Sequence, residues 1–68
     1  MQIDGTELDL EKHYLAPVTY VPNHAQGNAG HKDCEQGNLI KFTEAGVFVL
    51  YSKSRTTQLT DPSNLVWG

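Results

Sequence analysis

The stretch Asn-Leu-Ile-Lys-Phe-Thr-Glu-Ala-Gly-Val-Phe-Val-Leu-Tyr at residues 38–51 decides the fold. Its first six residues alternate, so that Ile40 and Phe42 lie on one face of an extended chain and Leu39 and Lys41 on the other. Successive side chains of a strand point to opposite faces of a sheet. This period of two predicts a strand over these six residues.

A tight turn and a second strand follow in the same stretch. Residues 44–46 are Glu-Ala-Gly, a three-residue hairpin connection in which the glycine can adopt a positive φ. Residues 47–51 are apolar at every position, so both faces of this strand are apolar. A strand of this kind is typically covered on both sides. The cover is expected from the rest of the domain with its N-terminal extension, or from another subunit, which would make the protein a homo-oligomer.

Short strands and turns are predicted on both sides of this hairpin. Residues 18–21, 56–60 and 65–67 are rich in β-branched and aromatic side chains or in threonine, and they favour strands. Residues 61–64, Asp-Pro-Ser-Asn, favour a turn or a 3₁₀ helix, because proline presets φ and the Asp and Ser side chains bind nearby backbone groups. Residues 22–37 form a glycine- and asparagine-rich loop, and a loop of about 16 residues in a compact domain is usually functional.

Residues 1–15 are expected to form an extension before the sheet. Asp4 and Gly5 give a turn signal, and Thr6 is placed to cap one short helix. Residues 16–68 then follow the order strand, long loop, hairpin, strand, 3₁₀ turn and short last strand, which resembles the SH3-like barrel. Closing such a sheet hides its edge strands. The predicted fold is therefore all-β, a small five-stranded SH3-like barrel with a short N-terminal extension.

Two longer stretches resemble a group of short, uncharacterised proteins encoded by bacteriophages and prophages. One runs from Val-Thr-Tyr-Val-Pro-Asn-His-Ala at residues 18–25 to His-Lys-Asp-Cys-Glu-Gln-Gly at residues 31–37, and the other from Val-Phe-Val at residues 47–49 through Thr57 and Gln58 to Asp-Pro-Ser-Asn-Leu-Val-Trp at residues 61–67. The resemblance implies an accessory protein in the cytoplasm of a bacterial host. Small accessory proteins of this kind bind a host protein, or sequester a nucleotide signal used in host defence. Both are roles of a non-enzymatic binding module.

Composition and charge exclude several other classes. The 68 residues contain 5 Lys and Arg against 8 Asp and Glu, for a net charge of −3. An acidic chain lacks the basic face that phosphate contacts require, so nucleic-acid binding is not expected. The longest apolar run, residues 47–51, is far shorter than the roughly 20 residues that cross a bilayer, and no secretory leader is visible. The single cysteine, Cys34, forms no disulfide within the chain and indicates a reducing compartment.

The long loop and the turn before residues 56–60 are expected to form the binding surface. Backbone donors of a glycine-rich loop can hold an anion or a peptide, and Lys32 or Arg55 would neutralise a phosphate. The partner is expected to be a host protein or a small phosphorylated ligand. The candidate binding residues are Tyr20, His24, Asn28, His31, Lys32, Lys53, Arg55 and Gln58. Tyr51, Pro62 and Trp67 are expected near the same groove.

The loop also contains a candidate metal site. His24, His31 and Cys34 have the spacing His-x6-His-x2-Cys, and imidazole and thiolate are ligands that zinc prefers. A structural zinc needs a fourth ligand, from His13 or from a carboxylate flanking Cys34. A small zinc-stabilised interaction domain is therefore one alternative. The favoured interpretation has no cofactor: the histidines form hydrogen bonds within the loop, and Cys34 packs as a small apolar side chain.

No catalytic site is predicted. The acidic residues that flank Cys34 disfavour a thiolate nucleophile at that position. The plasmid-borne dihydrofolate reductases resemble this chain in size and strand order, and their key strand has the form Val-Gln-x-Tyr. The equivalent stretch here is Thr-Gln-Leu-Thr at residues 57–60, which lacks the tyrosine. We therefore expect that the protein is not an enzyme.

Overall fold

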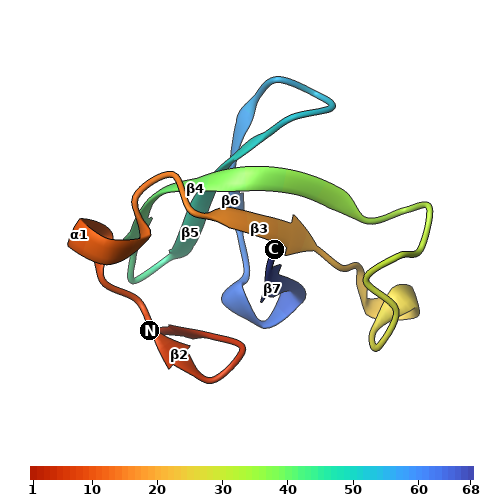
Figure 1. The fold of residues 1–68 in the computed structure, drawn as a ribbon, viewed down its shortest axis with the longest axis horizontal. Helices are drawn as coiled ribbons and strands as arrows, with labels where there is room; N and C mark the ends of the chain where they lie inside the picture. The colour runs from red at the N-terminus through yellow and green to blue at the C-terminus, as the bar shows by residue number, and fades with distance from the viewer.

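A five-stranded antiparallel sheet is the largest element of the molecule (Figure 1). The structure is a computed structural model that describes residues 1–68. The strands of this sheet are β3 (Pro17–Tyr20), β4 (Glu35–Thr43), β5 (Gly46–Tyr51), β6 (Thr57–Thr60) and β7 (Leu65–Trp67). Their order in the sheet is β6-β5-β4-β3-β7, which confirms a mostly β fold. Because β6 and β7 lie at opposite edges and do not pair, hydrogen bonds do not close the sheet into a barrel.

A second, two-stranded sheet lies at the N-terminus. Its strands β1 (Gln2–Ile3) and β2 (Thr6–Glu7) pair antiparallel. Asp4 and Gly5 join them with φ values of 49° and 82°. Two successive positive φ values are what a two-residue hairpin turn needs. The predicted turn is therefore confirmed, and it is part of a hairpin that the sequence did not predict.

One short helix, α1 (Leu10–His13), follows this hairpin. It begins later than expected: Asp9, not Thr6, caps it, and the Asp9 side chain accepts a hydrogen bond from the second helical amide. At the other end, the ring of His13 lies 4.8 Å from the ring of Trp67, measured between centres. The helix is thus positioned against the last strand of the large sheet.

A β-bulge changes the faces of β4. The pairing of β4 with β5 shifts register between Leu39 and Lys41, so Ile40 is the extra residue. Leu39 is fully buried, and Phe42 packs against the same core. The expectation that Leu39 and Phe42 lie on opposite faces is therefore wrong, because the inserted residue reverses the alternation beyond it.

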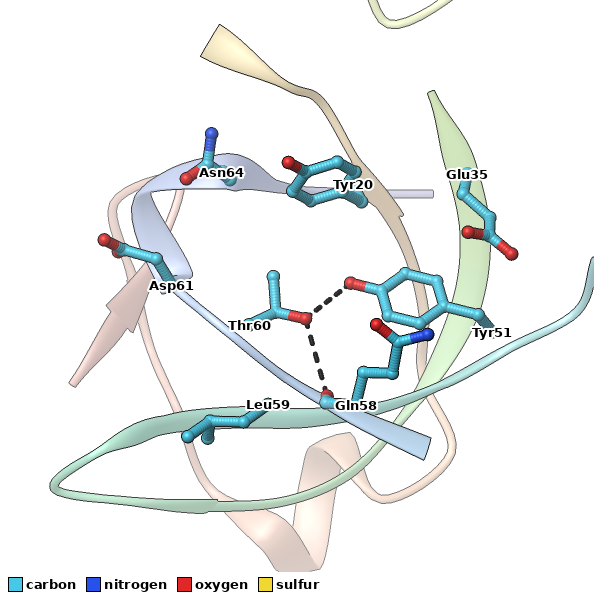
Figure 2. Close-up of a pocket in the computed structure, with 8 residues that line it drawn as sticks. All are labelled: Tyr20, Glu35, Tyr51, Gln58, Leu59, Thr60, Asp61 and Asn64. Atoms are coloured by element: carbon cyan, nitrogen blue, oxygen red, sulfur yellow. Dashed lines mark hydrogen bonds between the residues drawn. The ribbon is translucent and has the colours of Figure 1, made fainter. Parts of the chain in front are cut away.

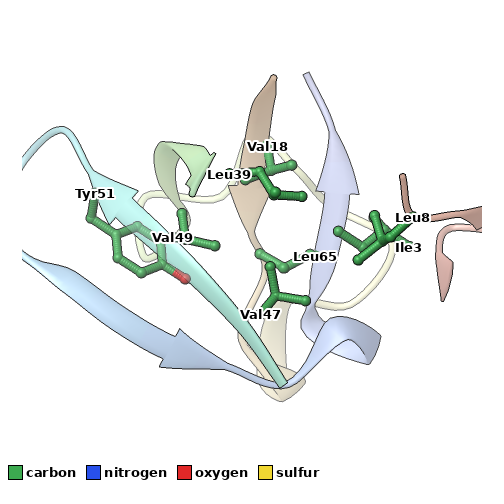
Figure 3. Packing of buried hydrophobic residues seen from close by; sticks show 8 residues of the cluster. All are labelled: Ile3, Leu8, Val18, Leu39, Val47, Val49, Tyr51 and Leu65. Atoms are coloured by element: carbon green, nitrogen blue, oxygen red, sulfur yellow. The ribbon is translucent and has the colours of Figure 1, made fainter. Parts of the chain in front are cut away.

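One apolar core joins the large sheet to the N-terminal segment (Figure 3). Its eight buried residues are Ile3, Leu8, Val18, Leu39, Val47, Val49, Tyr51 and Leu65. Ile3 is fully buried, and its carbonyl accepts a hydrogen bond of 2.9 Å from the indole N–H of Trp67. Two residues of the N-terminal segment, Ile3 and Leu8, are therefore part of the core. Trp67, expected near the binding groove, lies instead against this N-terminal segment.

β5 has one buried face and one face that the chain leaves partly open. Its inward side chains are buried, whereas Phe48 is half-buried and Leu50 is 39% exposed. The ammonium group of Lys41 lies 4.8 Å from the centre of the Phe48 ring and shields part of this outer face. The expectation that both faces are covered is therefore wrong within the single chain. The homo-oligomer stays a prediction.

The connections confirm one prediction and correct another. η2 (Pro62–Asn64) is the predicted 3₁₀ helix, and the Asp61 side chain caps it. The long loop ends at residue 34, three residues earlier than expected, because β4 begins at Glu35. Within the loop, η1 (Asn23–Ala25) and further turns give the backbone local structure. None of the helices has the length and apolar composition needed to cross a bilayer.

Candidate functional site

An open cleft of about 390 Å³, which we name the tyrosine cleft, lies where β3, β4, β6 and η2 meet (Figure 2). It is lined by Tyr20, Glu35, Tyr51, Gln58, Leu59, Thr60, Asp61 and Asn64. Tyr20 pairs with Glu35 on one side and with Leu65, which follows η2, on the other. The sheet register therefore brings the two ends of the long loop beside the 3₁₀ helix, and residues distant in sequence converge on one space.

Two tyrosine rings lie at the centre of the cleft. Tyr51 is only 4% exposed, and its hydroxyl lies 2.6 Å from Thr60 Oγ1 (Figure 2). Burial raises the pKa of Tyr51 above its ordinary value, and the hydrogen bond with Thr60 partly opposes this effect. Tyr20 is half-buried, and its ring meets that of Tyr51 edge to face with 6.3 Å between centres. The cleft thus combines one buried phenol with one accessible aromatic ring.

Acidic groups determine the charge of the cleft. Glu35 and Asp61 line it, and none of the five Lys and Arg residues does. Hydrogen bonds from the amide and the hydroxyl of Ser63 lower the pKa of Asp61, so this carboxylate is charged at neutral pH. Glu35 accepts a hydrogen bond of 3.1 Å from the Ser54 amide, which links it to the turn before β6. This charge distribution attracts cations and repels phosphate.

A second group of polar side chains lies in the long loop. His24 Nε2 is 2.8 Å from Asp33 Oδ2, and His31 Nδ1 is 3.9 Å from the same oxygen. His24, His31 and Asp33 each offer one atom that could bind a metal ion, and these three atoms lie within 4.8 Å of one another. Cys34 is not part of the group, because its thiol donates to the carbonyl of Asn28 at 3.5 Å. The structure therefore brings Asp33, and not the predicted Cys34, to the two histidines.

Four predicted binding residues line two neighbouring clefts. Tyr20 and Gln58 line the tyrosine cleft. His31 and Lys53 line a second open cleft of about 320 Å³, together with Glu35. Because Glu35 borders both spaces, they share one wall. The predicted surface is thus divided into an acidic part with tyrosines and a mixed part beside the loop.

The remaining candidates contribute little to either cleft. The Asn28 side chain accepts a hydrogen bond from the amide of Gly30 and so stabilises a loop turn. Lys32 and Arg55 line none of the five cavities of the molecule. Arg55 occupies a left-handed turn position with φ of 56°. The cations expected to hold a phosphate are therefore not gathered at one cavity with Lys53.

Sequence reasoning missed most of the tyrosine cleft. Asp61 caps the predicted 3₁₀ helix and Asn64 ends it, and both were predicted only as residues of that turn. Asn64 donates hydrogen bonds to the Val21 carbonyl and to Asn23 Oδ1, so it fixes η2 to the start of the long loop. A contact between segments more than 40 residues apart leaves no local pattern. For Asp61 the sequence did contain a signal: an Asp before Pro-Ser is a typical helix cap, and this predicts a carboxylate fixed beside the 3₁₀ helix.

The arrangement of the tyrosine cleft suits the recognition of a cationic side chain. Its carboxylates accept charge-assisted hydrogen bonds, and the face of a tyrosine ring attracts an ammonium or guanidinium group. The buried hydrogen bond between Tyr51 and Thr60 keeps one wall rigid. No known protein family, curated protein or solved structure matches this chain.

Proposed function

We propose that the protein is a non-enzymatic SH3-like module that binds a segment of a host protein through the tyrosine cleft. The segment presents a lysine or arginine side chain to the cleft. One observation carries this proposal: two tyrosine rings line one open cleft, with a carboxylate at each end and no basic residue among the lining side chains (Figure 2). The resemblance of residues 18–37 to phage and prophage accessory proteins supports a bacterial cytoplasmic protein as the partner.

The strand order supports an SH3-like architecture. β3 pairs with both β4 and β7, while β4, β5 and β6 follow one another as hairpins. A long loop separates the first two strands of the sheet, and a 3₁₀ helix separates the last two. In SH3-like barrels the peptide groove runs between the first loop and the turn before the fourth strand. The tyrosine cleft borders both, because Tyr20 and Glu35 flank the loop and Gln58 follows the turn.

The expected contacts are individually weak. A cation over an exposed tyrosine contributes about 0.5–1 kcal/mol, and an exposed ion pair contributes about 0.2–1 kcal/mol. A basic side chain over Tyr20 that reaches either Asp61 or Glu35, which lie at opposite ends of the cleft (Figure 2), combines both kinds of contact. Neighbouring residues of the segment would add apolar contact with Leu59, which is 49% exposed at the edge of the cleft.

The geometry favours this role over the sequestering of a small phosphorylated ligand. A phosphate site needs several positive groups or amide donors around one anion. Lys53 lines a cleft that also contains Glu35, and Lys32 and Arg55 line no cavity. The tyrosine cleft has the opposite charge from the one that a phosphate requires.

A random peptide display library, selected for binding to the immobilised full-length protein, tests the proposal. The enriched peptides are expected to contain lysine or arginine. Calorimetry of one synthetic peptide should then show several-fold weaker binding to the double variant Glu35→Gln/Asp61→Asn, because losing two exposed carboxylate contacts removes about 0.4–2 kcal/mol. Asparagine at position 61 also caps helices well, so this variant is expected to keep η2.

The double variant Glu11→Gln/Glu44→Gln is the matched control. It also removes two negative charges, but from exposed positions that do not line the tyrosine cleft. Its peptide affinity should stay within about twofold of the original, because only long-range steering is lost. Equal weakening in both double variants, or enriched peptides without basic residues, would contradict the proposed site.

A further inference from the structure

We propose that the long loop binds one divalent transition-metal ion, with Zn²⁺ as the first choice, through His24, His31 and Asp33. These residues do not line the tyrosine cleft, so the inference does not rest on the function proposed for that cleft. His24 belongs to η1, whereas His31 and Asp33 lie in the turn before β4. A bound ion would therefore connect the two halves of the loop.

The distances within the cluster are close to those of a zinc site. Ligand bonds of about 2.1 Å at tetrahedral angles place neighbouring ligand atoms about 3.4 Å apart. The distances from Asp33 Oδ2 to His24 Nε2 and to His31 Nδ1 are 2.8 and 3.9 Å, one below and one above that separation. The two imidazole rings meet edge to face with 5.4 Å between centres. All three donor atoms lie within 4.8 Å of one another, so binding one ion would require the side chains to rotate until the donors surround it.

The donor chemistry points to a transition metal. Two imidazoles and one carboxylate suit Zn²⁺ and related ions better than Mg²⁺ or Ca²⁺, which prefer oxygen ligands. Three protein ligands leave a coordination position for water. The side chains of His24 and Asp33 are 62% and 48% exposed, so an ion and its water can reach them. His31 Nδ1 now accepts a hydrogen bond of 3.0 Å from the Asp33 amide. Coordination of a metal ion at this nitrogen would replace that bond, and the Asp33 amide would then donate its hydrogen bond to water.

The loop is short of other stabilising interactions. None of the side chains of residues 26–34 is buried, so this half of the loop adds nothing to the apolar core. It is held by local hydrogen bonds, among them the contact between His24 and Asp33. A ligand that binds only the folded state stabilises that state, by an amount that rises with the logarithm of the ligand concentration once it exceeds the Kd. Metal binding would therefore be expected to raise the melting temperature of the domain.

The test is a calorimetric titration of the untagged, metal-free, full-length protein with Zn²⁺ alone. We expect one ion per chain. Asp33→Asn and, separately, His24→Gln should each weaken binding at least tenfold, since each removes one of three ligands. Cys34→Ser is the matched control and should change the affinity by no more than about twofold. Circular dichroism should show the same β signal for all variants, because the three altered side chains lie in a loop outside the core.

The outcomes separate this site from the one predicted from sequence. Absence of binding by the unaltered protein would overturn the proposal. So would binding that Cys34→Ser abolishes and Asp33→Asn retains, because the ligands would then include the thiolate. Binding that no variant weakens would assign the ion to some other part of the surface. Substitution of Co²⁺ gives an independent readout: a thiolate-to-cobalt absorption band would contradict the proposed ligand set, and its absence with bound Co²⁺ would support it.

Discussion

The large sheet and the long loop of residues 21–34 are held together by different interactions. The sheet shares an apolar core of eight buried residues with the N-terminal hairpin, and its five strands pair by backbone hydrogen bonds. Val21 and Ala25 at the start of the loop are buried, but the rest of the loop depends on single polar contacts, such as the hydrogen bond of 2.8 Å from Gln26 Nε2 to the Val21 carbonyl. Stability should therefore follow apolar volume in the sheet, while the loop should tolerate substitution. Binding groups can change in the loop without loss of the fold.

The largest expected effect is the loss of core volume in the sheet. Leu39→Ala should destabilise the domain by about 2–5 kcal/mol, because Leu39 is fully buried and the cavity cannot fill completely. A core of this size supplies only about 3–5 kcal/mol. Chemical denaturation followed by circular dichroism should show a midpoint far below that of the original protein, or no folded baseline at all.

Leu59→Ala is the control for this substitution. Leu59 is 49% exposed on β6, so the same change in side chain removes little buried surface. Its denaturation midpoint should stay close to that of the original protein. Similar losses in the two variants would mean that the division into core and surface described above is wrong.

A glycine-to-alanine pair compares the sheet and the loop directly. A Cβ at Gly37 in β4 would lie 2.6 Å from Val49 Cγ1 and 2.7 Å from the Leu50 carbonyl oxygen. Removing this steric clash requires the paired backbone of β5 to move, so Gly37→Ala should lower the free energy of unfolding by about 1–3 kcal/mol. Gly30→Ala in the loop meets nothing closer than Asn28 Oδ1 at 3.6 Å and should change stability by no more than about 0.5 kcal/mol. Urea unfolding of both variants measures the difference, and a loss at Gly30 as large as that at Gly37 would refute the comparison.

A smaller effect, and one that depends on pH, is expected at Tyr51. Tyr51→Phe leaves the ring in the core but removes the buried hydrogen bond to Thr60, a loss of about 1 kcal/mol near neutral pH. Burial raises the folded-state pKa of Tyr51, so folding favours its protonated form. The stability that comes from this preference is fully present below the unfolded pKa of about 10 and is lost as the pH rises through the folded pKa. The difference in stability between the two proteins should therefore shrink above about pH 10.

Tyr14→Phe serves as the control for this titration. Tyr14 is 60% exposed, and no hydrogen bond involves its hydroxyl, so this variant should follow the unaltered protein across the alkaline range. Thermal melts at several pH values measure all three proteins. A constant difference between the Tyr51→Phe and unaltered proteins at alkaline pH would show that burial does not perturb this phenol.

Prediction from sequence succeeded where the cause is local. The hairpin and its strands depend on alternation and on a glycine, and Gly46 has the expected positive φ, 143°. The connection is nevertheless one residue shorter than predicted, because Gly46 pairs with Thr43 as the first residue of β5 and only Glu44 and Ala45 form the turn. The capped 3₁₀ helix after Asp61 depends on proline and on short polar side chains. The bulge at Ile40 was missed, because the partner strand β5, and not the residues of β4 alone, decides where an extra residue is accommodated.

The candidate sites show the same limit. Tyr20 and Gln58 were predicted as binding residues and line the tyrosine cleft, whereas Glu35 and Asp61, which set its charge, were not. The metal prediction chose Cys34 because thiolates bind zinc well, but the loop turns Asp33 toward the histidines. The local backbone conformation decides where each side chain of two neighbouring residues points. The sequence alone therefore does not show which of Asp33 and Cys34 faces the histidines.

By itself, the sequence determined a mostly β domain, its main hairpin, the long polar loop and the final 3₁₀ turn. These depend on the period of apolar residues and on the φ preferences of glycine and proline, which act over a few residues. Only the tertiary structure decided that Ile3 enters the core, that the sheet does not close by hydrogen bonds and that two carboxylates and two tyrosines line one cleft. Those features depend on contacts between distant segments, and the free energy of such contacts comes from packing that no local pattern encodes.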